Sequence, residues 1–332
     1  MHVLVAGGAG YIGSHMVRRL GKAGVDVTTL DNLSSGRCEA VTHGRFVEGD
    51  LGDRALLDRL FDRTGIDSVM HFAAHIQIGE SVADPAKYYA NNVVKTQVLL
   101  DAMRAHGIDK LIFSSSAAIF GEPRQRRIDE THAKAPINPY GRTKLVVEQM
   151  LGDYDAAYGI KSVCLRYFNA AGADPDGGIG ECHEPETHLI PLVLRAASGR
   201  SEAVTVFGTD HDTPDGTCIR DYVHVNDLCD AHMRAMRSLS NGAGSAAFNL
   251  GNGNGFSVLD VTGAATAVTG REIPIVFGRR RLGDPARLVA DASRARAVLG
   301  WTPRYQKLED IVAHAWQWER ALAARCGHRI RD

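Results

Sequence analysis

The sequence has no run of about 18 consecutive apolar residues, and this absence argues against a transmembrane helix. It has no excess of charge either, because 38 basic and 39 acidic side chains leave a net charge of −1. Such a balance provides no basic field for nucleic acid and no polybasic patch for a membrane surface. The six cysteines follow no paired motif, so we expect reduced thiols in an intracellular protein. An apolar run that begins at Val3 leaves no room for a signal peptide, and we therefore expect a cytoplasmic location.

The rest of the composition is ordinary for a globular enzyme: 332 residues, of which 44% are hydrophobic and 23% charged. Short apolar runs alternate with amphipathic stretches in the first half, which is typical of βαβ units. Predicted strands cover 2–6, 25–30, 45–48, 67–73, 109–114 and 161–166, and predicted helices cover 11–23, 53–64, 85–106 and 140–158. The predicted fold class is therefore α/β, with a Rossmann-type doubly wound parallel sheet and a smaller α/β substrate-binding lobe.

The pattern changes after about Arg166. Residues 170–188 are rich in Gly, Pro, Asp and Glu and show little periodicity, which is typical of a long loop over a site. We predict a dinucleotide-binding domain over 1–168, to which residues 219–245 return. A smaller substrate-binding domain is predicted over 169–218 and 246–332.

The first apolar run breaks into glycines at Gly7, Gly10 and Gly13, directly before a predicted helix. This spacing allows a tight turn, a close approach of the backbone to a pyrophosphate, and close packing of helix and strand. The second predicted strand closes with Asp31, near the distance expected for the carboxylate that binds an adenosine ribose. A carboxylate there repels a 2′-phosphate, so the motif favours NAD over NADP.

Tyr140 and Lys144 lie one turn apart at the start of a predicted helix. A phenol is a poor base at neutral pH, because its ordinary pKa is about 10. We expect the ammonium of Lys144, together with the cationic nicotinamide ring, to favour the phenolate. Ser116 ends the fifth predicted strand and is placed to share a hydrogen bond with a substrate hydroxyl. The three residues form a candidate proton-transfer set.

Several longer segments add to these motifs: Gly7–Ser14, residues 31–34, 79–82, 88–93, Ser114–Gly121, Asn138–Lys144, Arg166–Asn169, Thr187–Pro191, Asp215–Val225 and Phe248–Gly251. In these segments the chain resembles the extended short-chain dehydrogenase/reductase family, and within it the enzymes that epimerise UDP-sugars at C4. The resemblance runs over essentially the whole chain. Residues 215–222 are especially specific, since a generic dehydrogenase has no need of them.

The resemblance implies a role for each matching residue. The implied NAD contacts are Gly7, Gly10, Tyr11, Ile12 and Gly13 at the pyrophosphate, Asp31 and Asn32 at the ribose, and Asp50 and Leu51 at the adenine. Phe72, Ala73 and Ala74 are implied to line the cofactor with Asn91 nearby, Phe168 to border the nicotinamide, and Tyr140 and Lys144 to contact the cofactor as well. The implied catalytic residues are Ser116, Tyr140 and Lys144. The implied UDP-sugar contacts are Ser116 at the reacting sugar hydroxyl, Asn169 and Leu189 at the diphosphate, Thr205, Val206 and Phe207 at the uracil, and Arg220, Arg281 and Asp284 at phosphate and ribose.

The activity implied is an isomerase reaction, the NAD-dependent inversion of C4 of a UDP-hexose (UDP-glucose/UDP-galactose) through a transient 4-keto intermediate. Epimerases for UDP-N-acetylglucosamine or for UDP-pentoses share these motifs and stay open as alternatives. A sugar-nucleotide dehydratase needs acidic residues after the serines, where Ala117 and Ala118 stand here. A non-catalytic NAD-sensing regulator would lack the Tyr140 and Lys144 pair.

Some positions depart from the family pattern, among them His75, Phe120 and Leu288. Leucine at the last position is of intermediate size, which leaves N-acetylated sugars undecided. His183, Glu184, Glu186 and His188 form a cluster, but they lack a tight ligand motif, and we predict no metal site there. Similar enzymes are dimers, so we expect a homodimer in which helices at 85–106 and 140–158 meet those of a second copy.

Overall fold

A seven-stranded parallel sheet forms the centre of the protein, in a computed structural model that describes residues 1–281 and 284–325. The strand order is β11-β6-β5-β4-β1-β2-β3, and every neighbouring pair runs parallel. The strands are β1 (His2–Ala6), β2 (Asp26–Asp31), β3 (Arg45–Glu48), β4 (Ser68–His71), β5 (Lys110–Ser116), β6 (Lys161–Tyr167) and β11 (Ala246–Leu250). The order reverses between β1 and β4, and a dinucleotide binds at such a reversal in this fold. The predicted fold class is confirmed.

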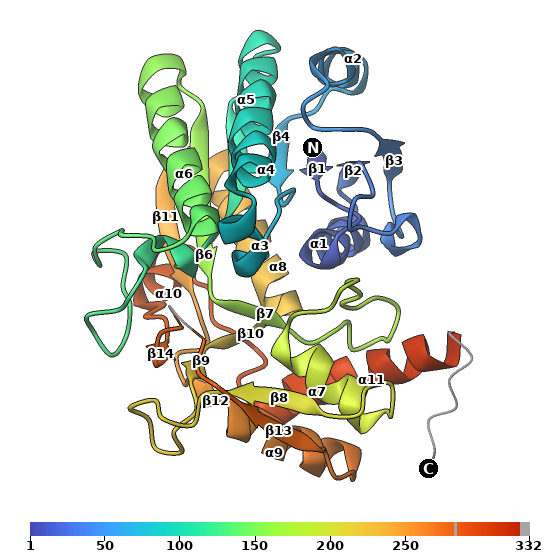
Figure 1. Cartoon of the computed structure of the whole chain (residues 1–332). Coiled ribbons are helices and arrows are strands. Elements are labelled where there is room, and N and C mark those ends of the chain that lie inside the picture. The colour runs from blue at the N-terminus through green and yellow to red at the C-terminus, as the bar shows by residue number, and fades with distance from the viewer. Residues whose placement is uncertain (282–283, 326–332) are drawn as a thin grey trace.

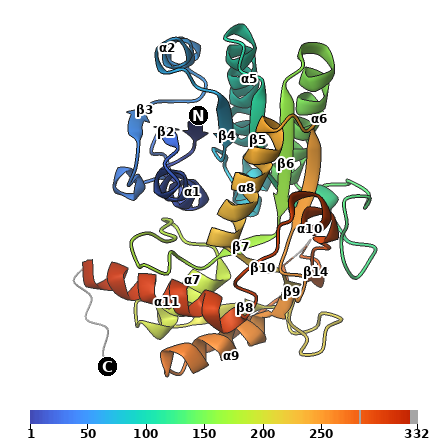
Figure 2. The same ribbon diagram turned by 180° about the vertical axis from the view of Figure 1, so that it is seen from behind.

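Helices cover both faces of this sheet (Figures 1 and 2). One face carries α1 (Tyr11–Lys22), α8 (Val225–Ser240) and α10 (Ser293–Leu299), and the other carries α2 (Arg54–Thr64), α5 (Lys95–Ala105) and α6 (Pro139–Tyr158). Each face has its own apolar core, and the strands between them are buried on both sides. Burial on both faces explains why the strands read as continuous apolar runs rather than alternating ones.

Local signals fix the bounds of α6, the helix that carries Tyr140 and Lys144. The side chain of Asn138 caps the helix by accepting the N–H of Gly141 at 2.8 Å, and Pro139 occupies its first turn. Gly159 ends it in a left-handed conformation, with φ of 75°. These caps place the first turn of α6 beside the carboxyl end of β5.

The smaller part of the molecule packs below the large sheet in Figure 1 and contains three short sheets. Their strands are β7 (Asn169–Ala171) with β10 (Tyr222–His224), β8 (Val204–Phe207) with β13 (Ile275–Gly278), and β9 (Ile219–Arg220) between β12 (Phe256–Ser257) and β14 (Arg287–Leu288). Helices α7 (Leu189–Ala197), α9 (Val258–Thr269) and α11 (Leu308–Arg325) share a third apolar core.

The structure differs from the sequence-based prediction in how the chain returns to the large sheet. Strands β9 and β10 do not join that sheet, whereas α8 covers it and β11 extends it, so the returning segment runs from Val225 to Leu250 rather than over 219–245.

The helix predicted at 85–106 is also different. It consists of α4 (Pro85–Tyr89), a π-helical turn η2 (Ala90–Val94) and α5, and a short helix α3 (Ile78–Ala83) precedes it. Within the described residues, no helix is long and apolar enough to cross a membrane.

Candidate active site

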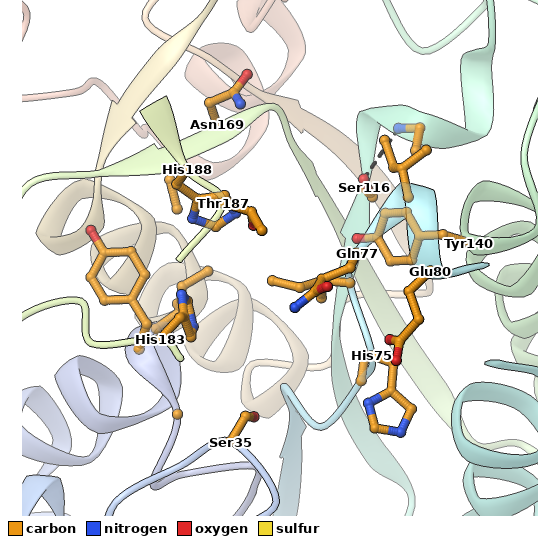
Figure 3. A pocket seen from close by; sticks show the side chains of 18 of the residues that line it. Ser35, His75, Gln77, Glu80, Ser116, Tyr140, Asn169, His183, Thr187 and His188 are labelled. Atoms are coloured by element: carbon orange, nitrogen blue, oxygen red, sulfur yellow. Dashed lines mark hydrogen bonds between the residues drawn. The ribbon is translucent and has the colours of Figure 1, made fainter. Parts of the chain in front are cut away.

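A cavity of about 960 Å³ runs along the carboxyl ends of β1, β2, β4 and β5 and continues to the short sheets. All the residues predicted to contact NAD line it, as do the three predicted catalytic residues. Figure 3 shows part of its wall, with Asn169, His183 and His188 on one side and Ser116, Tyr140 and Glu80 on the other.

The glycine motif forms the end of the cavity beside α1. A Cβ atom on Gly7 would lie 2.5 Å from the Ala73 amide nitrogen, and one on Gly13 would lie 2.1 Å from the Gly7 carbonyl oxygen. A Cβ on Gly10 would meet only the Gly7 oxygen, at 3.4 Å, so the space beside it belongs to the cavity. Gly10 provides no side-chain cap for α1, and the first amides of that helix are available to an anion. This cradle fits the pyrophosphate of a dinucleotide.

Acidic side chains follow β2 and β3 along the same wall. Asp31 accepts the backbone N–H of Ala9 at 2.9 Å and that of Leu33 at 2.8 Å, which fixes its carboxylate at the cavity. Asp50 accepts Asn32 Nδ2 at 2.9 Å and Lys95 Nζ at 2.6 Å. Burial raises the pKa of Asp50, but the hydrogen bonds from Lys95, Gly52 and Asn32 and the charge of Lys95 together outweigh burial and hold that pKa below its usual value. Sequence reasoning missed Lys95, which lines the cavity from α5.

The π-helical turn η2 shapes the middle of this wall. Asn91 lines the cavity. The next side chain, Asn92, is buried and connects η2 by hydrogen bonds to the segment after β4 and to α6. Asn92 Oδ1 accepts the N–H of His75 at 2.9 Å, and Asn92 Nδ2 donates to His75 O at 3.0 Å and to Thr143 Oγ1 at 3.1 Å. A π turn of this kind is common at functional sites, since it re-aims side chains within a helix. It holds the segment after β4 against α6.

Ser116, Tyr140 and Lys144 come together where β5 meets α6. Ser116 Oγ accepts the N–H of Ala118 at 3.1 Å, and its hydroxyl lies beside that of Tyr140 (Figure 3). Lys144 is buried, donates to the Ser114 carbonyl oxygen at 2.9 Å, and lies 6.0 Å from the Tyr140 ring centroid. The three predicted catalytic residues therefore share one corner of the cavity.

The electrostatics of this corner correct one expectation. Burial raises the pKa of Tyr140, and a hydrogen bond with Ser116 lowers it by less. Burial also lowers the pKa of Lys144 to about 7, although the carboxylate of Glu148 acts in the opposite direction. The protein alone thus does not produce the lowered phenol pKa that the lysine led us to expect, because Lys144 is desolvated and directs its hydrogen bond to Ser114.

Glu148 lies one turn beyond Lys144 on α6 and was missed by sequence reasoning. Its buried carboxylate accepts Ser115 Oγ at 2.6 Å, Arg166 Nε at 2.9 Å and Arg166 Nη2 at 2.6 Å. These bonds join α6 to the ends of β5 and β6 directly behind the catalytic corner. They fix the position of Lys144 relative to Ser116.

The opposite wall comes from the short sheets and α7. Asn169 begins β7, and α7 begins at Leu189 without a side-chain cap from His188. Thr205 and Phe207 of β8 line the cavity as expected, but Val206 does not. The side chain of Val206 is 1% exposed and packs in a small apolar cluster with Cys218 and Val258. Successive side chains of a strand point to opposite faces, which is why the expectation for Val206 was wrong.

Charged side chains complete that wall. Arg220 pairs with Asp284 and donates to the carbonyl oxygens of Ile219 and Pro285 at 2.8 Å each. The Arg281 guanidinium carbon lies 3.8 Å from the ring centroid of Phe207. All three charged residues predicted to bind the substrate therefore line the cavity.

Sequence reasoning gave no individual role to several further residues that line the cavity: His75, Gln77, Glu80, Tyr88, His183, Thr187 and His188. Glu80 belongs to α3, and its Oε2 accepts Tyr88 Oη at 2.9 Å. The residues 183–188 belong to the predicted loop over the site, where only the resemblance at Thr187–Pro191 pointed to substrate.

Comparisons with known proteins agree with this geometry. A sequence model of the NAD dependent epimerase/dehydratase family matches residues 3–251. The UDP-glucose 4-epimerase of Halalkalibacterium halodurans is 51% identical over 320 residues, which are 96% of this chain and 96% of that protein. The structure of a UDP-glucose 4-epimerase from Brucella ovis in complex with NAD is 49% identical, with a TM-score of 0.93 over 95% of this chain and 98% of the other.

A further solved structure carries a pentose nucleotide. The UDP-glucose-4-epimerase from Stenotrophomonas maltophila, with bound NAD and formylated UDP-arabinopyranose, is 40% identical and has a TM-score of 0.95 over 98% of this chain and 99% of the other.

Proposed function

The chain belongs to the NAD dependent epimerase/dehydratase family, and on that premise we propose that it inverts C4 of a UDP-hexose and so interconverts UDP-glucose and UDP-galactose. It is an NAD-dependent isomerase. The observation that carries the proposal is one continuous cavity in which a dinucleotide cradle, the corner of Ser116, Tyr140 and Lys144, and the pair of Arg220 and Asp284 face one another.

NAD bound along β1, β2 and β4 would accept a hydride from C4 of the sugar and return it to the opposite face. Tyr140 takes the proton of the 4-hydroxyl group as the C4–H bond breaks, so that C4 becomes a ketone. Ser116 shares a hydrogen bond with the same hydroxyl and keeps it within reach of Tyr140. Tyr140 gives the proton back when the C4–H bond forms again, and the net oxidation state of sugar and cofactor does not change.

Lys144 acts on this transfer electrostatically. A positive charge near the phenol favours the phenolate, whereas burial of Tyr140 disfavours it. Glu148 supports the charged form of Lys144 and holds α6 against β5 through Ser115. We infer that Glu148 is a positioning residue for this proton transfer.

Inversion requires that the nucleotide stay fixed while the ketone turns over. The charged residues Arg220, Arg281 and Asp284 lie at the end of the cavity that we assign to the nucleotide, and Asn169 and the first turn of α7 lie toward its diphosphate. The corner around Ser116 instead contains Ala117 and Ala118, which offer the sugar no side-chain hydrogen bond. The nucleotide is thus held at many points and the sugar at few.

Ala117 and Ala118 also argue against a dehydratase, since no acidic side chain stands there to eliminate water. The alternatives that remain are UDP-N-acetylglucosamine and UDP-pentoses. Leu288 lines the cavity and limits the space at the sugar, and a neighbour structure contains a UDP-pentose derivative. These substrates differ from UDP-glucose in volume at the sugar, not in the groups that catalysis needs.

The test is incubation of the purified protein with UDP-glucose, UDP-N-acetylglucosamine or UDP-xylose, without added cofactor, followed by separation of the products. We expect UDP-galactose from UDP-glucose and stoichiometric NAD in the protein. Protein that carries no nicotinamide and leaves all three sugars unchanged would contradict the proposal.

The cofactor and substrate halves divide as proposed domains, with the NAD half comprising 1–168 and Val225–Leu250. We also propose a homodimer through α5 and α6, which lie side by side at one flank in both views (Figures 1 and 2). Two exposed apolar side chains support it: Val94, the last residue of η2 directly before α5, and Tyr158, the last residue of α6. Light scattering at micromolar concentration tests it, and a monomer would contradict it. The cytoplasmic location stays a prediction.

A further inference from the structure

Four residues of the loop between β7 and α7 form a compact cluster at the cavity wall. The potential ligand atoms of Glu181, His183, Glu186 and His188 all lie within 4.8 Å of one another. Glu181 is buried, and one of its oxygens, Oε1, is close to Nδ1 of both imidazoles, at 3.1 Å for His183 and in a short hydrogen bond for His188. A single carboxylate oxygen therefore orients two rings.

This orientation leaves the other nitrogen of each ring free. Since both Nδ1–H groups are directed to Glu181, both Nε2 atoms are on the far sides of their rings. Within the described part of the chain, neither Nε2 atom has a hydrogen-bond partner, and both residues line the cavity. The rings pack edge to face, with centroids 5.5 Å apart.

The charges of the cluster support a doubly protonated pair. Burial lowers the pKa of His183, but its hydrogen bonds to the carboxylates of Glu181 and Glu186, together with their negative charges, outweigh burial and raise the pKa to about 10. The charge of Glu181 raises the pKa of His188. Burial raises the pKa of Glu181, but the two imidazoles outweigh it and hold the pKa at about 2. Glu186 contributes less directly, because its Oε1 lies 3.8 Å from Nδ1 of His183 and accepts the backbone N–H groups of Thr187 and His188.

The pair lies close to the first residues of two helices, α1 and α7, which line the cavity. The His183 ring packs edge to face on Tyr11, the first residue of α1, at 6.4 Å between centroids. His188 directly precedes α7. Figure 3 shows both rings across the cavity from Ser116 and Tyr140, away from the reacting corner. Helix N-termini with available amides attract anions, and an imidazolium close to such a helix start adds positive charge to the same wall of the cavity.

We propose that His183 and His188, oriented by Glu181, form a paired Nε2–H donor site for the diphosphate of a bound nucleotide. The inference rests on the proposed function only in that two nucleotides share this cavity. A metal ion is disfavoured, since Nδ1 of each ring is directed at Glu181 and Glu186 already accepts two backbone amides. The diphosphate can come from NAD or from the UDP-sugar, and the two sources are separable by experiment.

The decisive variant is His183→Asn. The amide nitrogen of asparagine takes the place of Nδ1 and keeps the link to Glu181, but nothing replaces Nε2. Calorimetry of the holoenzyme with UDP and with uridine isolates the diphosphate. If the substrate diphosphate is bound, the affinity for UDP falls about tenfold while that for uridine does not change. If the diphosphate of NAD is bound, the purified variant contains less NAD, and added NAD restores it.

Two further variants sharpen the test. His183→Gln places a neutral donor near the position of Nε2 and should recover part of the lost affinity. His106→Asn serves as the matched control, because His106 also bonds a carboxylate, Asp58, at 2.9 Å, but lies outside the cavity between α2 and α5. It should bind both nucleotides normally.

The proposal is overturned if His183→Asn binds UDP and retains NAD as the unaltered protein does. It is equally overturned if the unaltered protein contains a stoichiometric metal ion that this variant lacks. Since binding is measured without turnover, either result leaves the epimerase activity standing, and absence of that activity leaves the binding result interpretable.

Discussion

The two walls of the cavity are built by different means. The wall toward NAD is built mainly from glycines, small side chains and backbone amides at the ends of long parallel strands, with a few polar side chains such as Asp31 and Asp50 held at the ends of those strands. The wall toward the substrate consists of charged side chains that short sheets and a loop bring together. The first wall depends on close backbone packing, and the second depends on side chains that hold one another in place, such as Arg220 with Asp284.

This contrast matches the different ways in which the cofactor and the substrate must be bound during the reaction. A cofactor that stays bound through many cycles needs a rigid cradle in which the backbone itself makes the contacts. A substrate that must enter and leave needs contacts of high specificity that can be made and broken, and ionic hydrogen bonds supply these. The corner of Ser116, Tyr140 and Lys144 belongs to the first wall, so the chemistry is attached to the rigid side.

The largest effect is expected at the reacting corner of the first wall. Tyr140→Phe removes only the hydroxyl group, so the proton of the sugar hydroxyl has no acceptor and kcat should fall by about 10³-fold. NAD should stay bound, because the ring remains in place. Turnover measured with UDP-glucose, beside the NAD content of the protein, checks both expectations. Near-normal turnover would refute Tyr140 as the base.

A methyl group in the glycine cradle should damage the cofactor wall specifically. In Gly13→Ala the added Cβ would lie 2.1 Å from the Gly7 carbonyl oxygen, so the backbone must shift. We expect a loss of roughly 3 kcal/mol or more in the free energy of unfolding and a loss of bound NAD. Urea unfolding and NAD content measure the two effects.

Gly152→Ala is the matched control for this substitution. Gly152 lies within α6, and a Cβ there meets no atom within 4 Å. Alanine is the better helix former by about 1 kcal/mol, so the control should be slightly more stable and keep its NAD. Equal effects of both substitutions would show that the glycine cradle has no special role.

The substrate wall should respond through KM. Arg220→Lys keeps the charge but cannot pair with Asp284 and also donate to the carbonyls of Ile219 and Pro285. We expect KM for UDP-glucose to rise about tenfold with little change in kcat. Arg63→Lys, on the exposed end of α2, is the control. A drop in kcat at unchanged KM would place Arg220 in the chemistry instead.

How far the sequence predicts each wall follows from the same contrast. The glycine motif and the strand-end residues could be predicted, because each belongs to one βαβ unit whose geometry is local. Val206 was placed wrongly because a resemblance covers three consecutive residues of β8, although only alternate side chains of a strand share a face. If the side chains of β8 had been expected to alternate between its two faces, Val206 would have been excluded from the cavity.

Other features depend on contacts that no local pattern encodes. Whether β9, β10 and β11 join the large sheet is decided by tertiary packing, since strands of two to five residues carry little signal. The cluster of Glu181, His183 and His188 packs against Tyr11 through the ring of His183, and Tyr11 is far away in the sequence. The lowered pKa of Lys144 likewise arises from burial, which the spacing of Tyr140 and Lys144 does not reveal.

A further difference between the two walls concerns pH, which should act on them at opposite ends of the pH scale. Behind the cofactor wall, burial lowers the pKa of His232 to about 4 and that of His71 to about 3. An imidazole in the unfolded chain has a pKa of about 6.5, so the unfolded chain binds more protons between about pH 6.5 and pH 4. The free energy of unfolding should therefore fall as the pH falls through this window.

At the substrate wall the sign is reversed. The raised pKa of His183, about 10, means that its contribution is complete below about pH 6.5 and is lost as the pH rises toward about 10. Plotted against pH, the free energy of unfolding has an acid limb below about pH 6.5 and an alkaline limb above it. His232→Asn should reduce the slope of the acid limb by at most about 1.4 kcal/mol per pH unit and leave the slope of the alkaline limb unchanged. His183→Asn should flatten only the alkaline limb. Urea unfolding followed by tryptophan fluorescence across this pH range measures both. If both variants changed the same limb, the two walls would not be electrostatically separate, because one titrating network would then span the cavity.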